Sequence, residues 1–344
     1  MENPAPETPE TPDPALENVG IVVIGRNEGE RLKTSLRSVR AHLPRVVYVD
    51  SGSEDDSVAF ARSMGVEVVE LDMSTPFTAG RARNEGYERL LSMAPETEFV
   101  HFVDGDCEIV EGWLPNALAA MEADERRAAV WGLLVERHPD ATPYNRLCDT
   151  EWRWCYPYGD VPYCGGIALM RVSALREVGG FNGALIAGEE PEMCFRMREG
   201  GWRIHRLHDV MALHDADIRR FGQWWRRAVR TGYADAERAW MHRQKKGQYW
   251  GRNVVRVWVW TFGVVAVSVG AAPWTMGLSG LLPFVYVVQA GRLARGLASQ
   301  GVPWSRALRY GVFSVLAKFA MVAGHIRFAR IRCVGKHREL IEHR

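Results

Sequence analysis

Hydrophobic and polar residues alternate in a regular order along the first third of the chain. Short, uninterrupted apolar runs are typical of strands that are buried on both faces of a parallel sheet. These runs cover residues 19–24, 46–49, 66–69 and 99–103. The segments between them are expected to be helical, at residues 30–41, 57–63 and 80–91. Strands that alternate with helices of this length predict an α/β domain with a doubly wound, mostly parallel sheet.

A second hydrophobic pattern follows in the last quarter of the chain. Residues 257–291 contain no charged side chain and are too many for one membrane span of roughly 20 residues. Pro and Gly interrupt the run at 273–283, so we expect two short membrane helices joined near 273–280. Arginines flank both ends, which by the positive-inside rule places both ends in the cytoplasm. The alternative is a soluble helical core. The flanking arginines are Arg252, Arg256, Arg292 and Arg295.

The pattern also gives domain limits. Residues 1–18 are rich in Pro, Glu and Thr and predict a disordered tail without the apolar core of a secretory signal. Residues 19–250 are expected to form the α/β domain, and 251–344 a membrane hairpin with interfacial helices. The segment 308–329 is apolar but carries Lys, His and Arg, which favours an amphipathic interfacial helix.

Charge changes this picture in one region. The formal net charge is +1, but residues 219–256 carry a block of Arg and Lys that only Asp235 and Glu237 oppose. Such a block contacts the phosphates of nucleic acid or of a lipid surface. Its position beside the apolar run favours membrane lipids over nucleic acid. The six cysteines show no CxxC pairing, which argues against a zinc site and a disulfide framework and favours a reducing cytoplasm.

Two carboxylates, Asp104 and Asp106, follow the strand at 99–103 and are separated by Gly105. Ligands of open α/β sheets bind at the carboxyl ends of the strands, where Asp50 also falls. A positive φ at Gly105 would let both carboxylates turn toward one hard cation such as Mg²⁺ or Mn²⁺. The alternative is a plain surface turn. The sequence has no GxGxxG after its first strand and no GxxxxGK[ST], which argues against dinucleotide enzymes and P-loop NTPases.

Several motifs in order resemble the family-2 glycosyltransferases of GT-A fold, over roughly residues 19–233. They are Val-Ile-Gly-Arg-Asn-Glu at 23–28, Val-Asp-Ser-Gly-Ser-Glu-Asp at 49–55, Gly-Arg-Ala-Arg-Asn-Glu-Gly at 80–86, Val-Asp-Gly-Asp at 103–106, Cys-Gly-Gly at 164–166, Val-Gly-Gly-Phe at 178–181 and Gly-Glu-Glu-Pro-Glu at 188–192.

The resemblance implies roles for the matching residues. The donor nucleotide and its diphosphate would be bound by Asn27, Glu28, Asp50, Ser53, Arg83, Asn84 and Asp104. The metal would be held by Asp104, Asp106 and His214. Glu190, the second acid of the family's ED motif, would be the catalytic base. The acceptor or diphosphate would contact Gly165, Gly166, Glu189, Gln223 and Arg226.

The chain departs from the family pattern at two positions. The base is Glu190 where the family has Asp, which lengthens the side chain by one methylene. The segment from Gln223 resembles the family's QxxRW but ends in Arg227 instead of Trp, which argues against processive synthesis. Each of these motifs also has a structural explanation without a catalytic role. Acidic residues are favourable at a helix N-terminus, and a lone His is often structural. The segment from Gln223 also fits an amphipathic helix on a membrane.

Together these features predict a membrane-attached, inverting glycosyltransferase of hexosyltransferase type that uses Mn²⁺ or Mg²⁺. Its donor would be a nucleotide-diphospho-sugar, and its acceptor a lipid-linked glycan or a polysaccharide. It would lie on the inner (cytoplasmic) membrane with its catalytic domain facing the cytoplasm. The alternative is a non-catalytic nucleotide-sugar-binding or scaffold subunit of a membrane glycan-assembly complex.

Overall fold

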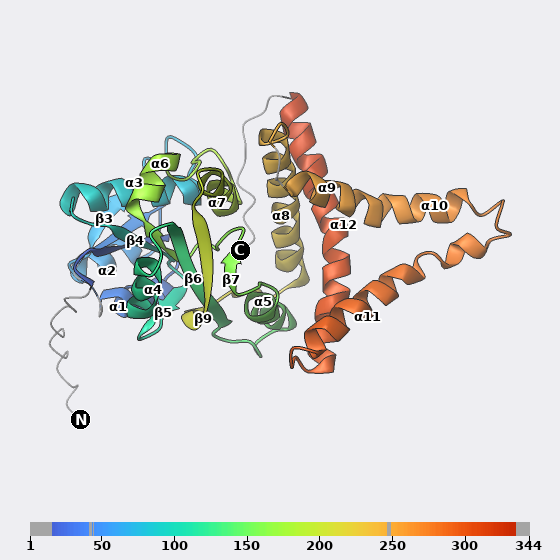
Figure 1. Cartoon of the computed structure of the whole chain (residues 1–344), viewed down its shortest axis with the longest axis horizontal. Helices are drawn as coiled ribbons and strands as arrows, with labels where there is room; N and C mark the ends of the chain where they lie inside the picture. The colour runs from blue at the N-terminus through green and yellow to red at the C-terminus, as the bar shows by residue number, and fades with distance from the viewer. Residues whose placement is uncertain (1–15, 41–42, 44, 246–248, 335–344) are drawn as a thin grey trace. The chain divides into compact units, whose positions relative to one another are not determined.

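The computed structural model describes residues 16–40, 43, 45–245 and 249–334. Contacts divide the chain into two compact units. The sheet unit contains Met1–Arg137, Pro157–Ala184 and Glu189–Asp215. The helical unit contains His138–Tyr156, Leu185–Gly188 and Ala216–Arg344. Residues 216–250 therefore group with the C-terminal helices, which differs from the expected boundary at residue 250. Figure 1 labels the elements in chain order.

The sheet unit is built on a nine-stranded sheet in the order β3-β2-β1-β4-β8-β6-β9-β5, with β7 paired to β9. Its first four strands are parallel, and they are the strands that the sequence predicts. They are β1 (Val19–Gly25), β2 (Val46–Asp50), β3 (Glu67–Glu70) and β4 (Phe99–Asp104). The helices between them are α1 (Glu30–Arg40), α2 (Ser57–Ser63) and α3 (Ala79–Met93). The predicted α/β fold with a mostly parallel sheet is confirmed.

The helix α3 packs closely on this sheet at Gly86. A Cβ atom at Gly86 would lie 2.4 Å from Cγ1 of Val22 in β1. The glycine therefore allows the helix to lie close to the strand. This close approach sets how near to the sheet the residues before Gly86 on α3 lie. The N-terminal boundary also differs from expectation, because Leu16 is buried and the carbonyl of Asn18 accepts the backbone N–H of Phe99. The rest of the expected tail, residues 1–15, lies outside the described residues.

The second half of the sheet is mixed. β8 pairs antiparallel with both β4 and β6, and β9 pairs parallel with β6 but antiparallel with β5 and β7. The strands are β5 (Cys107–Ile109), β6 (Arg127–Glu136), β7 (Gly159–Val161), β8 (Ala168–Arg171) and β9 (Arg203–His214). The helices are α4 (Trp113–Glu122), α6 (Val172–Val178) and α7 (Glu189–Glu199).

The helical unit is organised around two long helices that touch along their lengths, α8 (Phe221–Met241) and α12 (Trp304–Val334). Glycines allow close backbone approach, since a Cβ at Gly232 would lie 2.2 Å from the carbonyl oxygen of Met321. α5 (Pro143–Trp154) and α11 (Phe284–Ala298) also pack on α12. The expected interfacial helix at 308–329 is thus the middle of one continuous helix.

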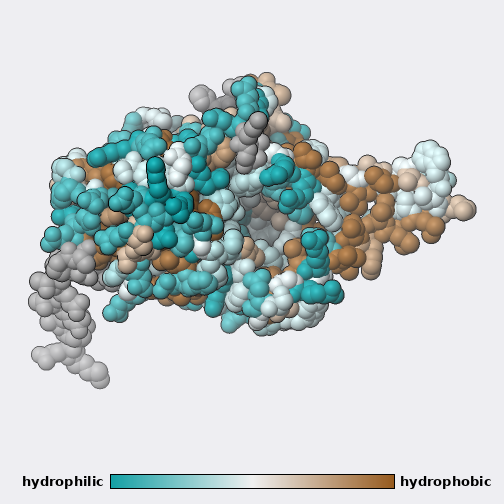
Figure 2. Space-filling model, viewed as in Figure 1, coloured by the Kyte–Doolittle hydropathy of each residue, from teal (hydrophilic) through white to brown (hydrophobic). Residues whose placement is uncertain are grey.

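An apolar hairpin extends from these helices. It consists of α9 (Trp250–Trp258), the π-helical turn η2 (Val259–Gly263), α10 (Val264–Gly270), the 3-10 turn η3 (Leu278–Leu281) and α11. Figure 2 shows hydrophobic residues gathered over the hairpin, and Val267, Trp274 and Leu281 are among its exposed side chains. Trp250–Gly270 and Trp304–Val334 are long and apolar enough to cross a membrane, judged by length and composition only.

Candidate active site

The carboxyl ends of three parallel strands bring the expected donor-site residues to one edge of the sheet. The register pairs Gly25 of β1 with Asp50 of β2, and Ile24 of β1 with Asp104 of β4. The two acids therefore end the strands that neighbour β1, within one residue of each other in register. This edge is where ligands of open α/β sheets bind.

Arg83 of α3 is the cation at this edge. Its guanidinium is buried and donates hydrogen bonds of 2.8 Å to Oδ1 of Asp104 and 2.8 Å to Oε1 of Glu189. Its Nη1 atom also lies 3.5 Å from Oε1 of Glu190. One guanidinium thus faces three carboxylates from the end of β4 and the start of α7. The fork geometry of arginine suits this arrangement, because its donors point in fixed directions.

Glu190 stands in the first turn of α7 and keeps 16% of its side chain exposed. Burial raises its pKa to about 7, the neighbouring charge of Glu189 adds to this shift, and Arg83 opposes it. A carboxylate with a pKa near the working pH is suited to general base catalysis. The position of Glu190 therefore combines access to a substrate with the basicity that proton abstraction requires.

Gly166 lies directly against this cluster. A Cβ atom at Gly166 would be 2.4 Å from Nη2 of Arg83, 2.9 Å from Oε1 of Glu190 and 3.0 Å from Oδ2 of Asp104. The neighbouring Gly165 differs, because no atom of the described residues lies within 4 Å of a Cβ built there. Of the two glycines, it is Gly166 whose missing side chain leaves room for the charged groups.

Asp106, the second acid of the Asp-Gly-Asp turn, points toward His214. Antiparallel pairing of β5 with β9 sets Cys107 opposite His214, so that Oδ1 of Asp106 lies 3.3 Å from Nε2 of His214. The carboxylate of Asp106, the thiol of Cys107 and the imidazole of His214 have ligand atoms within 4.8 Å of one another. Burial lowers the pKa of His214, but the charge of Asp106 raises it, and the net shift is upward.

These residues fit a hard divalent cation through two of the three groups. Carboxylate oxygen and imidazole nitrogen are suitable donors for Mn²⁺. The thiol of Cys107 is a soft ligand and suits a hard divalent cation least of the three groups. Asp106 and His214 therefore form the core of a candidate metal site, while Asp104 is engaged by Arg83.

The backbone at Gly105 differs from our expectation. Gly105 is not among the glycines with positive φ, so the two carboxylates do not turn toward one point by that route. A Cβ there would instead lie 3.1 Å from the carbonyl oxygen of Ile24 and 3.2 Å from Cγ of Glu28. The absence of a side chain at Gly105 lets the turn pack closely against β1.

Several residues expected at the nucleotide hold the loops of this edge together. The carboxylate of Asp50 accepts hydrogen bonds from the backbone N–H groups of Gly52 and Ser53, and from the hydroxyl of Tyr48 at 2.8 Å. The hydroxyl of Ser53 accepts from the backbone N–H of Asn27, which has a positive φ of 53°.

Two more of these residues have protein partners of their own. Glu28 is largely buried and pairs with Arg31 at 3.0 Å. Asn84 forms two hydrogen bonds with the backbone of Phe181, at 2.8 and 2.9 Å, and so braces the loop that follows α6. In this structure their polar groups stabilise the rim of the site.

Gln223 and Arg226 belong to the helical unit. Oε1 of Gln223 accepts the backbone N–H groups of Arg219 and Arg220 at 2.8 and 2.9 Å, so Gln223 caps the start of α8. Arg226 is exposed on the same helix. Their expected contact with acceptor or diphosphate stays a prediction.

Sequence reasoning missed the central position of Arg83 among three acids and the buried Arg238 of α8. The second had a detectable signal, because Asp235 precedes Arg238 by one helical turn on a helix with a marked apolar face. A charged residue on the core-facing side of a helix needs a partner once it is buried, and Asp235 supplies it.

The chain resembles known glycosyltransferases in sequence. Residues 20–179 match the family model described as glycosyl transferase family 2. The chain is 31% identical over 218 residues to the pre-mycofactocin glycosyltransferase of Mycobacterium tuberculosis, covering 59% of this chain and 43% of that protein. It is 23% identical over 235 residues to glycosyltransferase AglE of Haloferax volcanii, covering 65% of this chain and 74% of that protein. The chain thus spans less than half the length of the first relative.

A solved structure shares the fold. A mannosyltransferase from Pyrobaculum calidifontis, determined in complex with GDP-Man and Mn²⁺, superimposes with a TM-score of 0.56 and 19% identity. The alignment covers 91% of this chain and 87% of that chain. Residues 20–179 therefore match glycosyl transferase family 2, and the chain has the GT-A fold.

Proposed function

We propose that this protein is an inverting glycosyltransferase of hexosyltransferase type in which Glu190 is the catalytic base. The observation that carries the proposal is the group formed by Arg83 with Asp104, Glu189 and Glu190 at the carboxyl edge of the sheet. It sets a partly exposed carboxylate of near-neutral pKa beside the site expected for a nucleotide-diphospho-sugar.

The chemistry of sugar transfer matches these residues. The acceptor hydroxyl attacks the anomeric carbon while Glu190 accepts its proton, and the nucleoside diphosphate departs from the opposite face. Asp106 and His214 would hold Mn²⁺ or Mg²⁺, which neutralises charge on the diphosphate when bound. Support for the metal comes from the donor set and from the Mn²⁺ in the Pyrobaculum structure. Arg83 holds Asp104 and orients Glu189 and Glu190.

We further propose that the protein is attached to the inner membrane and acts there on a lipid-linked or polysaccharide acceptor. The support is the exposed apolar hairpin of α9–α11, whose side chains would otherwise meet water. A bilayer would cover them, and the arginines at the base of the hairpin would contact lipid phosphates from the cytoplasmic side. A membrane position would bring the catalytic domain near lipid-linked acceptors.

The decisive experiment measures turnover of a panel of nucleotide sugars with Mn²⁺ by the full chain in detergent. Glu190→Gln should lower kcat by roughly 10²–10⁴-fold and leave donor affinity nearly unchanged. Glu192→Gln is the matched control on the same helix, because Glu192 pairs with Arg196 and lies outside the cluster. A product with retained anomeric configuration would contradict the role of Glu190. Donor binding without turnover by the unaltered chain would instead indicate the non-catalytic scaffold.

A further inference from the structure

The four residues that directly precede α7 belong to the helical unit and not to the sheet unit. Leu185–Gly188 group with the helical unit, and Glu189 begins α7 of the sheet unit. Leu185, Ile186 and Ala187 are each at most 5% exposed. The residue that the proposed function makes the base, Glu190, is therefore two positions away from a segment held by other helices.

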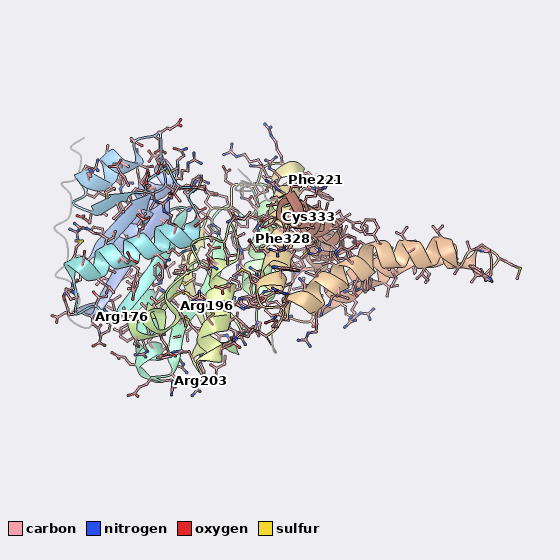
Figure 3. All side chains as sticks on the ribbon, turned by 90° about the horizontal axis from the view of Figure 1, so that it is seen from above. Arg176, Arg196, Arg203, Phe221, Phe328 and Cys333 are labelled. Carbon is pink, nitrogen blue, oxygen red and sulfur yellow. The ribbon has the colours of Figure 1, made fainter. Side chains whose placement is uncertain are left out.

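Apolar contacts fix the first part of this segment. Ile186 packs in a small core with Tyr233 of α8 and with Phe328 and Ile331 of α12. The ring of Phe328, labelled in Figure 3, meets that of Tyr233 edge-on at 5.6 Å between centroids. The segment is therefore part of the packing between the two long helices.

Two arginines of α8 hold its backbone. Nη2 of Arg230 donates to the carbonyl of Ile186 at 3.3 Å, and Nη1 of Arg238 donates to the carbonyl of Gly188 at 3.1 Å. Gly188 has a φ of +75°, and a Cβ there would lie 1.4 Å from Nη1 of Arg238. The guanidinium thus occupies the space where any other residue would place its side chain.

Arg238 is itself held in place. Its Nη2 atom donates to Oδ1 of Asp235 at 2.6 Å, and its guanidinium lies over the ring of Trp250 at 5.3 Å. The amide of Asn253 donates to the other oxygen of Asp235. Trp250 and Asn253 belong to α9, the first helix of the apolar hairpin. Arg238, Asp235 and Trp250 are buried and Asn253 is half-buried, so the orientation of Arg238 depends on α9 as well as on α8.

We infer that Arg238 is a positioning residue for the general base: by fixing the carbonyl of Gly188 it sets the first turn of α7 and, through it, the carboxylate of Glu190. This inference rests on the proposed function. Catalytic groups must be held within about 0.5 Å of their productive position. A misplacement of about 1 Å costs on the order of 10²-fold in rate.

The experiment uses the full chain in detergent and compares Arg238→Met with Arg238→Lys and with Arg306→Met. Arg306 is a matched control, because it pairs with Asp149, lies over Trp154 at 4.9 Å and belongs to the same unit, away from residues 185–188. Arg238→Met should lower kcat by roughly 10- to 100-fold with an unchanged KM for the donor. Arg238→Lys should recover part of the loss, and Arg306→Met should leave kcat within about twofold of the unaltered chain.

A double-mutant cycle separates positioning from general stability. If Arg238 acts through Glu190, Arg238→Met should cost little further activity in the Glu190→Gln background. Equal costs in both backgrounds, or an equal loss in Arg306→Met, would overturn the inference. If Arg238→Met does not fold, Asn253→Ala provides the milder perturbation and should lower kcat in the same direction; an unchanged kcat would overturn the inference. Full activity of Glu190→Gln alone would refute the proposed function and not the contacts of Arg238.

Discussion

Arg83 is the residue on which the chemistry of the site depends most directly. Its guanidinium reaches Asp104 and Glu189 with separate N–H groups and is close to Glu190 as well. Removing one partner of a buried ion pair leaves an uncompensated charge and typically costs 3–5 kcal/mol. The same residue thus stabilises the fold and limits how far the pKa of Glu190 rises.

The pKa of Glu190 predicts the pH dependence of turnover. A base must be deprotonated to act, so kcat should be half-maximal near pH 7 and should fall about tenfold per pH unit below it. Glu189 and Asp104 push the pKa up and Arg83 pulls it down. Steady-state kinetics between pH 5 and 9 would measure the profile. The residual activity of Glu190→Gln should lose this acid limb, and an inflection near pH 4.5 would contradict the prediction.

The two adjacent glycines provide a test of geometry at the cluster. Gly166→Ala places a methyl group within 3 Å of Arg83 and Glu190 and should lower kcat/KM by roughly 10²-fold. Gly165→Ala meets no atom of the described residues within 4 Å and should lower kcat/KM less than Gly166→Ala does. Kinetics of both variants, with melting temperatures alongside, would check this. If both substitutions lowered kcat/KM equally, the close contacts at Gly166 would not be the cause.

The candidate metal site makes its own prediction. Asp106→Asn and His214→Gln should each weaken Mn²⁺ binding by at least roughly tenfold, because each removes a direct ligand. Cys107→Ser is the matched control, since a soft thiol is a poor ligand for a hard cation, and it should bind as before. Electron paramagnetic resonance of free Mn²⁺ would measure the affinities without requiring activity. A strong loss of Mn²⁺ affinity in Cys107→Ser alone would show that the thiol is a metal ligand.

At the scale of elements, the parallel half of the sheet could be predicted because its strands are continuous apolar runs between helices. The mixed half could not, because β5, β7 and β8 are only three or four residues long and carry too few positions for a pattern. The long strand β9 has no continuous apolar run before Val210, because Ile204 and Leu207 alternate there with Arg, His and Asp. Its pairing partners lie far away in sequence.

The same limit applies to the site. Motif order located Asp104, Glu189 and Glu190 at strand and helix ends, as the structure has them. It could not show which polar side chains bond to the protein's own backbone. Asn84 braces a loop and Gln223 caps a helix, and both functions depend on backbone groups that no motif reveals.

At the scale of the whole molecule, the hairpin of α9–α11 predicts membrane attachment. Val267 and Val288 are more than half exposed on it. The double variant Val267→Asp, Val288→Asp should stop co-flotation with lipid vesicles, because each Asp costs about 2.5–3.5 kcal/mol at the centre of a membrane helix.

Met73→Asp is the control for this experiment, as an exposed apolar residue of the sheet unit that should leave flotation unchanged. Sucrose-gradient flotation would measure both variants. Unaltered protein that stays monomeric in buffer without detergent would show that the hairpin is not a membrane element.

The discontinuous helical unit has a consequence for biosynthesis. The buried carboxylate of Asp149 finds its partner in Arg306, which follows 157 residues later. At about 5–20 residues per second, a ribosome needs roughly 8–30 s to bridge that interval. During that time α5 and the segment 185–188 have left the ribosome without the helix that buries them. Nascent chains should therefore complete this unit only after α12 emerges, well after the parallel strands have been synthesised.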